Sequence, residues 1–132
     1  MLSTTGFFTV NALEGEQAIA EREREGWRIL RLPAHVTSKD EFFDGVRCTL
    51  PLDPPLHSNR SWDALADSLW AGLDGLPDDR IVVVWSDASS MEAHAPDDFA
   101  IAAEILRELP QSLSDTEVTA GATKQLLVLR VI

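Results

Sequence analysis

Apolar residues gather in three short runs that are typical of β-strands. The runs are residues 27–32 (WRILRL), 81–85 (IVVVW) and 124–132 (KQLLVLRVI). The middle run contains no polar position, a pattern that indicates a strand covered on both faces. Residues 6–10 (GFFTV) would also fit a short edge strand, but the expected sheet has three strands.

Between these runs the apolar residues recur at helical spacing. Ser38 followed by Glu41 is a capping box and predicts the start of a helix. Its apolar face would consist of Phe42, Phe43, Val46 and Leu50. Pro96, which two aspartates follow, predicts another helix start, with a core stripe between residues 99 and 109. Residues 51–60 (PLDPPLHSNR) contain three prolines and therefore predict a stiff loop.

Strands that alternate with helices predict an α/β fold with a small three-stranded parallel sheet and helices packed on it. The length of 132 residues fits a single domain. Residues 13–25 are rich in charge and end before Gly26, so they predict a peripheral helix. We therefore expect one domain over 1–132, in which residues 1–26 form an N-terminal helical extension and residues 27–132 form the core.

Residues 61–76 form the most informative segment, because their helical pattern has two distinct faces. Residues 62, 65, 66, 69, 73 and 76 form one apolar face when they are placed about 100° apart. Asp63, Asp67, Trp70 and Asp74 form a stripe on the flank, at spacings i, i+4, i+7 and i+11. Like charges at i and i+4 destabilise a helix, and residues 61–77 contain no lysine or arginine. This lack of local compensation favours a functional surface.

The overall charge indicates which partners this surface suits. The chain has 22 acidic and 11 basic residues, for a formal net charge of −11. Such a charge repels nucleic acids and anionic membranes and attracts basic proteins. No apolar run is long enough to span a membrane, so we expect a cytoplasmic protein; the oligomeric state stays open. The single cysteine, Cys48, excludes an internal disulfide and is expected to be buried.

Catalysis by the acidic stripe is the weaker hypothesis. Carboxylates act as acid and base when burial separates their pKa values, and this stripe is expected to be exposed. Asp53, His57 and Asp63 would be the ligands of a metal-assisted hydrolase, but their spacing matches no common metal motif. His35 and His94 are isolated in the sequence. We therefore expect no enzyme activity, no cofactor and no metal, and this hydrolase is the least favoured alternative.

Two features together resemble the barstar family, whose members are intracellular inhibitors of secreted bacterial ribonucleases. The first is residues 61–69 (SWDALADSL), which contain an Asp-Ala-Leu-x-Asp motif. The second is the order of elements from residue 27 to residue 132: strand, capped helix, loop, acidic helix, strand ending in tryptophan, helix and strand. The first 26 residues lie outside the resemblance.

The resemblance implies that the acidic helix and the preceding loop block the active site of a basic ribonuclease. Asp63 and Asp67 match the two aspartates of the motif, and Glu108 matches a glutamate on the following helix. The family prototype has aromatic residues where this chain has His57, Ser58 and Ala66, and Trp70 would replace that contact. The full expected interface is His57, Asn59, Asp63, Asp67, Trp70, Asp74 and Glu108, with Asp78 or Asp79 at its edge. An adaptor that binds a non-nuclease protein is the alternative.

Overall fold

The computed structural model describes residues 5–132, and its sheet has four parallel strands in the order β1-β4-β3-β2. The strands are β1 (Gly6–Val10), β2 (Arg28–Leu32), β3 (Arg80–Ser86) and β4 (Gln125–Val131). The expectation of three strands is wrong, because β1 pairs with β4 over its whole length. β1 is short and its partner lies at the far end of the sequence, so no local pattern predicted the pairing.

In the described part of the chain, five helices cover the sheet: α1 (Ala12–Arg24), α2 (Lys39–Thr49), α3 (Trp62–Asp74), α4 (Ala88–His94) and α5 (Pro96–Leu113). The predicted start of α2 is confirmed, since Ser38 Oγ accepts a hydrogen bond from the Glu41 amide at 3.1 Å. The sequence did not predict α4. This short helix directly follows β3, after Asp87 at a φ of 55°.

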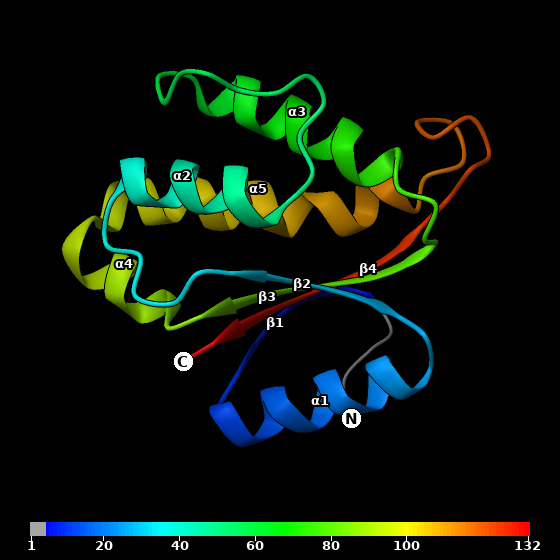
Figure 1. Ribbon diagram of the computed structural model, residues 1–132, viewed down its shortest axis with the longest axis horizontal. Helices are drawn as coiled ribbons and strands as arrows, with labels where there is room; N and C mark the ends of the chain where they lie inside the picture. Colours follow the sequence, from blue (N-terminus) through cyan, green and yellow to red (C-terminus); the bar gives the residue numbers. More distant parts are fainter. Residues whose placement is uncertain (1–4) are drawn as a thin grey trace.

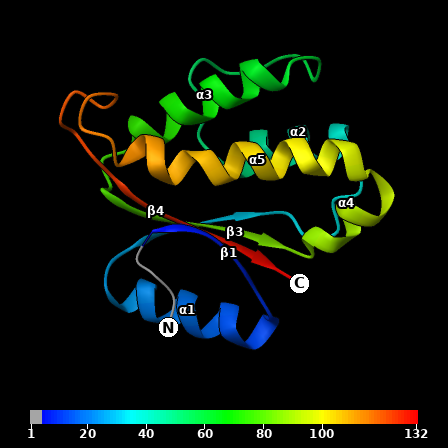
Figure 2. The same cartoon turned by 180° about the vertical axis from the view of Figure 1, so that it is seen from behind.

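The helices lie on opposite faces of the sheet because the chain crosses it in two directions. Figures 1 and 2 show α1 alone on one face and α2, α3, α4 and α5 on the other. From β1 to β2 the chain passes two strands, whereas from β2 to β3 to β4 it returns towards β1. Right-handed crossovers in opposite directions place their helices on opposite faces.

β3 is covered on both faces, as its sequence predicted. Ile81, Val83 and Trp85 pack in the core beneath α2, α3 and α5, whereas Val82 and Val84 pack in a smaller core towards α1. Helix α1 contributes Ala18 and Ile19 to that smaller core. The N-terminal extension is therefore a strand and a helix that complete the sheet and cover its second face, rather than a peripheral helix alone.

Cys48 is exposed, so the expectation of a buried thiol is wrong. The buried face of α2 is formed by Phe42, Phe43, Val46 and the adjoining Leu50. At about 100° per residue, position 48 points almost opposite to the centre of that face. The helical period, and not the general tendency of cysteine to be buried, determines its exposure.

Candidate functional site

Helix α3 presents the acidic stripe on its flank, beside the face that packs on the core. The hydroxyl of Ser61 caps the helix by accepting a hydrogen bond from the Ala64 amide at 3.0 Å. Leu65, Leu69 and Leu73 are fully buried against the rest of the core. Asp63 and Asp67 are exposed, whereas Trp70 and Asp74 are half-buried. The two faces that the sequence predicted are therefore both present.

A hollow of about 430 Å³ lies between α3, α5 and the loop that joins α5 to β4. Helices α3 and α5 lie side by side in both views (Figures 1 and 2). The lining residues are Ala66, Asp67, Trp70, Ile105, Glu108, Leu109, Ser112 and Val118. The structure thus brings together three predicted site residues, Asp67, Trp70 and Glu108. The other predicted residues, Asp63, Asp74, His57 and Asn59, do not line this hollow.

The two carboxylates in the hollow are available to a partner. Within residues 5–132, neither Asp67 nor Glu108 belongs to any ion pair. Arg107, the cation nearest to Glu108 in sequence, pairs instead with Glu104 at 2.9 Å. The hollow itself is lined by no lysine or arginine. The hollow therefore carries two negative charges that no ion pair within residues 5–132 neutralises.

Trp70 and Asp74 each contain a buried polar atom. The indole Nε1 of Trp70 and Oδ1 of Asp74 have no hydrogen-bond partner within the described part of the chain. Each buried group without a partner costs about 1–3 kcal/mol. This cost adds to the like-charge repulsion along the stripe, so α3 is not optimised for the stability of the fold alone.

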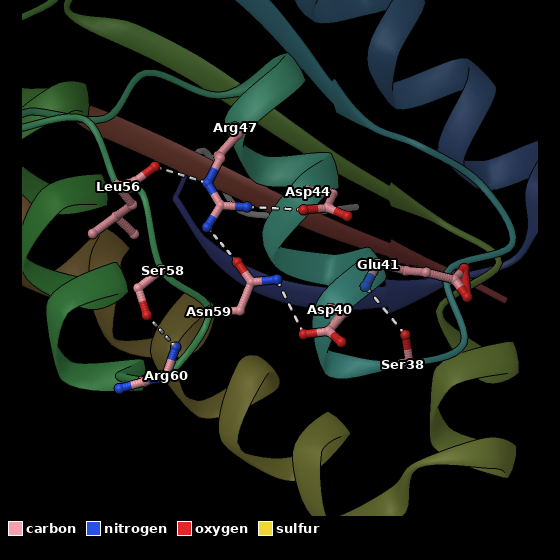
Figure 3. A network of polar contacts seen from close by, with 9 residues as sticks. All are labelled: Ser38, Asp40, Glu41, Asp44, Arg47, Leu56, Ser58, Asn59 and Arg60. Atoms are coloured by element: carbon pink, nitrogen blue, oxygen red, sulfur yellow. Dashed lines mark hydrogen bonds and ion pairs between the residues drawn. The ribbon is translucent and has the colours of Figure 1, made fainter.

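The loop before α3 is held on α2 by a polar network (Figure 3). Arg47 donates a hydrogen bond to the Leu56 carbonyl at 2.8 Å and another to Asn59 Oδ1. Asn59 Nδ2 in turn donates to Asp40 Oδ1 at 3.0 Å. Both ends of the Asn59 amide are thus used within the protein, so this predicted interface residue has an anchoring role. His57 is exposed on the same loop.

The start of the loop packs closely on α3. The Asp53 amide donates a hydrogen bond to the Ser68 carbonyl at 3.0 Å. A Cβ atom added to Gly72 would lie 2.2 Å from the Pro51 carbonyl oxygen. Gly72 is therefore required for this approach. The loop and the acidic helix form one continuous, fixed surface.

Lys124 supplies a cation at the C-terminal end of α3 that the local sequence lacks. Its buried ammonium donates hydrogen bonds to the carbonyls of Leu76 at 2.7 Å and Asp78 at 2.6 Å. A cation is favourable at the negative end of a helix. The charge of the helix end is thus compensated by tertiary structure, which the absence of basic residues at 61–77 could not indicate.

The three histidines occupy separate places. His35 Nδ1 lies 2.6 Å from Asp87 Oδ2, so it links the segments that follow β2 and β3. His94 lies at the end of α4, and His57 lies on the loop before α3. No group of three or more potential metal ligands occurs among residues 5–132. The proposed set of Asp53, His57 and Asp63 is therefore not assembled as a metal site.

We expect Asp87→Asn to lower the melting temperature near neutral pH and to have less effect in acid. Hydrogen bonds from Ser90 and then His35 hold the pKa of Asp87 below its ordinary value of 3.8. A carboxylate with a lowered folded-state pKa stabilises the fold above its unfolded-state pKa. That contribution is lost as the pH falls through the folded-state value.

Thermal unfolding of Asp87→Asn and the wild type at about pH 7 and about pH 3 tests this linkage. Glu117→Gln is the control, because Glu117 is exposed and its side chain accepts no hydrogen bond that the structure records. An equal loss of stability at both pH values would contradict the linkage, because it would not depend on the ionisation of the Asp87 carboxylate.

Comparison with known proteins decides the family. The family model described as "Barstar (barnase inhibitor)" matches residues 27–124. The chain belongs to the barstar family. Members of the barstar family are inhibitors and not enzymes. The match begins after β1 and α1, and it includes both helices that carry Asp67 and Glu108. Comparison with curated proteins and with solved structures gave no match.

Two parts of the candidate barstar-type site were not predicted from the sequence. The first is the apolar wall that Ile105 and Val118 add to the hollow. Val118 is an isolated apolar residue in a polar loop (SDTEVT), which was an available signal. The second is Lys124, which lies 48 residues from its acceptor Leu76.

No helix among the described residues is long and apolar enough to cross a membrane.

Proposed function

We propose that this chain inhibits a basic ribonuclease by inserting the carboxylates of α3 and α5 into its active site. One observation carries the proposal: Asp67 and Glu108, from different helices, line the same hollow and belong to no ion pair in residues 5–132. A ribonuclease active site is built to bind phosphate, and carboxylates bind the same arginine and lysine groups. Family membership supports a ribonuclease as the target.

The surrounding residues extend the contact in this proposal. Asp63 and Asp74 continue the stripe along α3, while His57 forms part of the exposed loop surface. Asn59 holds that loop through Arg47 and Asp40, which reduces the entropy lost when a partner binds. The net charge of −11 attracts a basic enzyme over a distance. Binding inside the cell, where the family acts, is part of the same proposal.

The test combines capture with an inhibition assay. The tagged protein, purified from its source cell, should retain a basic protein that shows ribonuclease activity once it is separated from the chain. Adding the chain back at an equimolar ratio should abolish that activity. A retained partner without nuclease activity would favour the adaptor alternative. A retained ribonuclease that stays fully active in the complex would overturn the inhibitory function.

We expect Asp79→Ala to slow association with the ribonuclease without changing dissociation. Asp79 is exposed in the turn before β3, at the expected edge of the interface. Charges at the edge of an interface act mainly through long-range attraction, which salt screens. Stopped-flow measurements should show a decrease of about 2- to 5-fold in the association rate at about 0.05 M salt, and almost none at about 0.5 M salt.

Glu23→Ala is the matched control for Asp79→Ala. Glu23 is also exposed, but it lies on α1, on the opposite face of the sheet. Its removal changes the net charge equally, so it separates a local effect from a general one. Equal rate changes in the two variants would show that Asp79 has no special place at the interface edge.

A further inference from the structure

The loop between α5 and β4 presents Val118 on a hydrogen-bonded turn. Asp115 Oδ1 accepts hydrogen bonds from the amides of Glu117 at 2.8 Å and Val118 at 3.2 Å. The Asp115 carbonyl accepts a further bond from the hydroxyl of Thr119 at 2.7 Å, and Thr119 is buried. The backbone around Val118 is therefore fixed, although 53% of the Val118 residue surface is exposed.

Val118 borders the same hollow as the two carboxylates. On α5, Ile105 and Glu108 also line the hollow, and Ile101 lies one turn before Ile105 with 41% of its surface exposed. Trp70 faces the hollow from α3. The lining of the hollow thus combines two carboxylates, Asp67 and Glu108, with an apolar wall formed by Trp70, Ile105, Leu109 and Val118.

Part of this apolar wall is open to a partner: Val118 is exposed and Trp70 and Ile105 are half-buried, whereas Leu109 is buried in the main core. Val118 and Ile101 are outside both core clusters, so they stabilise neither. A fixed, exposed apolar surface beside unneutralised charges is typical of the centre of a protein interface, where apolar anchors exclude water from charged contacts. A cation of the partner would pair with Asp67 and Glu108, but it would not cover the apolar wall.

We propose that this wall, formed by Trp70, Ile105, Leu109 and Val118, binds an aliphatic or aromatic side chain of the basic partner. That side chain lies beside the arginine or lysine that pairs with Asp67 and Glu108. The inference rests on the proposed function and adds a selection rule to it: among basic ribonucleases, the chain prefers those with an apolar residue next to the cationic active site. Charge complementarity fixes the position of the partner's arginine or lysine, and the apolar wall favours a partner that has an apolar side chain beside that cation.

The experiment measures binding of the ribonuclease retained in the capture assay to Val118→Ser. We expect the Kd to rise about 5- to 10-fold, because the variant removes apolar area from the contact. This rise should persist at about 1 M salt, since salt does not screen apolar burial. Leu13→Ser is the matched control: Leu13 is 64% exposed on α1, away from the hollow, and its variant should bind as the wild type does.

A second variant, Ile105→Ser, and an Asp67→Ala reference separate the possible failures. If Val118→Ser and Ile105→Ser bind normally while Asp67→Ala binds weakly, the apolar contact is wrong and the proposed function stands. If Asp67→Ala also binds normally, the proposed interface itself is wrong. Equal weakening by Val118→Ser and Leu13→Ser would also overturn the inference. Circular dichroism and melting curves confirm that each variant is folded before its binding is measured.

Discussion

Asp67→Ala should raise the Kd for the ribonuclease about 30- to 5,000-fold, mainly through faster dissociation. Removing one partner of a desolvated charge pair costs about 2–5 kcal/mol, a range known partly from the barnase–barstar complex of this family. In the free protein Asp67 is exposed and repels Asp63 one turn away. The variant should therefore keep its free energy of unfolding within about 0.5 kcal/mol of the wild type, with a slight gain.

Surface plasmon resonance and chemical denaturation measure the two effects separately. Asp67→Asn distinguishes loss of charge from loss of shape, and Glu16→Ala on α1 controls for the change in net charge. Wild-type dissociation of Asp67→Ala from a confirmed partner would show that the hollow is not the interface. A large loss of stability would show that Asp67 has a structural role which its exposure does not indicate.

Gly72→Ala should have the largest effect on stability. Its new Cβ would lie 2.2 Å from the Pro51 oxygen and 2.5 Å from the Pro51 carbonyl carbon. The obstacle is backbone, so no side-chain rotation relieves it, and either the loop or α3 must move. We expect a loss of about 3 kcal/mol, at the upper end of ordinary overpacking. Binding should weaken as well, because residues 51–60 are displaced from α3.

Urea denaturation and binding measurements on the same preparation test both consequences. Gly75→Ala is the matched control: Gly75 follows α3 at a φ of −78°, and its added Cβ would lie 3.3 Å from the Ala71 carbonyl oxygen. Its stability should change by less than about 1 kcal/mol. If Gly72→Ala were as stable as Gly75→Ala, the loop would be more adaptable than its contacts with α3 indicate.

Local periodicity predicted most of the fold. The helices α2, α3 and α5 each bury one recurrent set of apolar residues, and the strands β2, β3 and β4 are short apolar runs; both patterns are visible in a short window of sequence. The continuous apolar sequence of β3 also predicted cover on both faces. The sequence did not identify α1 as the second cover, because α1 packs with small residues, Gly15 and Ala18, and with Ile19. A helix with such a thin apolar face looks peripheral in sequence.

The candidate site was predictable only as far as one helix extends. Asp63, Asp67, Trp70 and Asp74 form a stripe because of helical spacing alone. The contact of α3 with α5 and the position of Val118 beside them depend on the tertiary structure, and the spacing of residues along the sequence does not predict them. Glu108 entered the predicted site through the family resemblance. Asn59 was expected at the interface, and in the structure its side-chain amide forms hydrogen bonds with Arg47 and Asp40.

The pairing of β1 with β4 has a consequence for how the chain folds as it is synthesised. Gly6 lies opposite Leu127, so the first strand has no partner in the sheet until β4, more than 110 residues later, has left the ribosome. Closing so long a loop is slow, whereas β2, β3 and their connecting helices can associate earlier. β1 and α1 should therefore dock late, and substitutions in them should accelerate unfolding more than they slow folding.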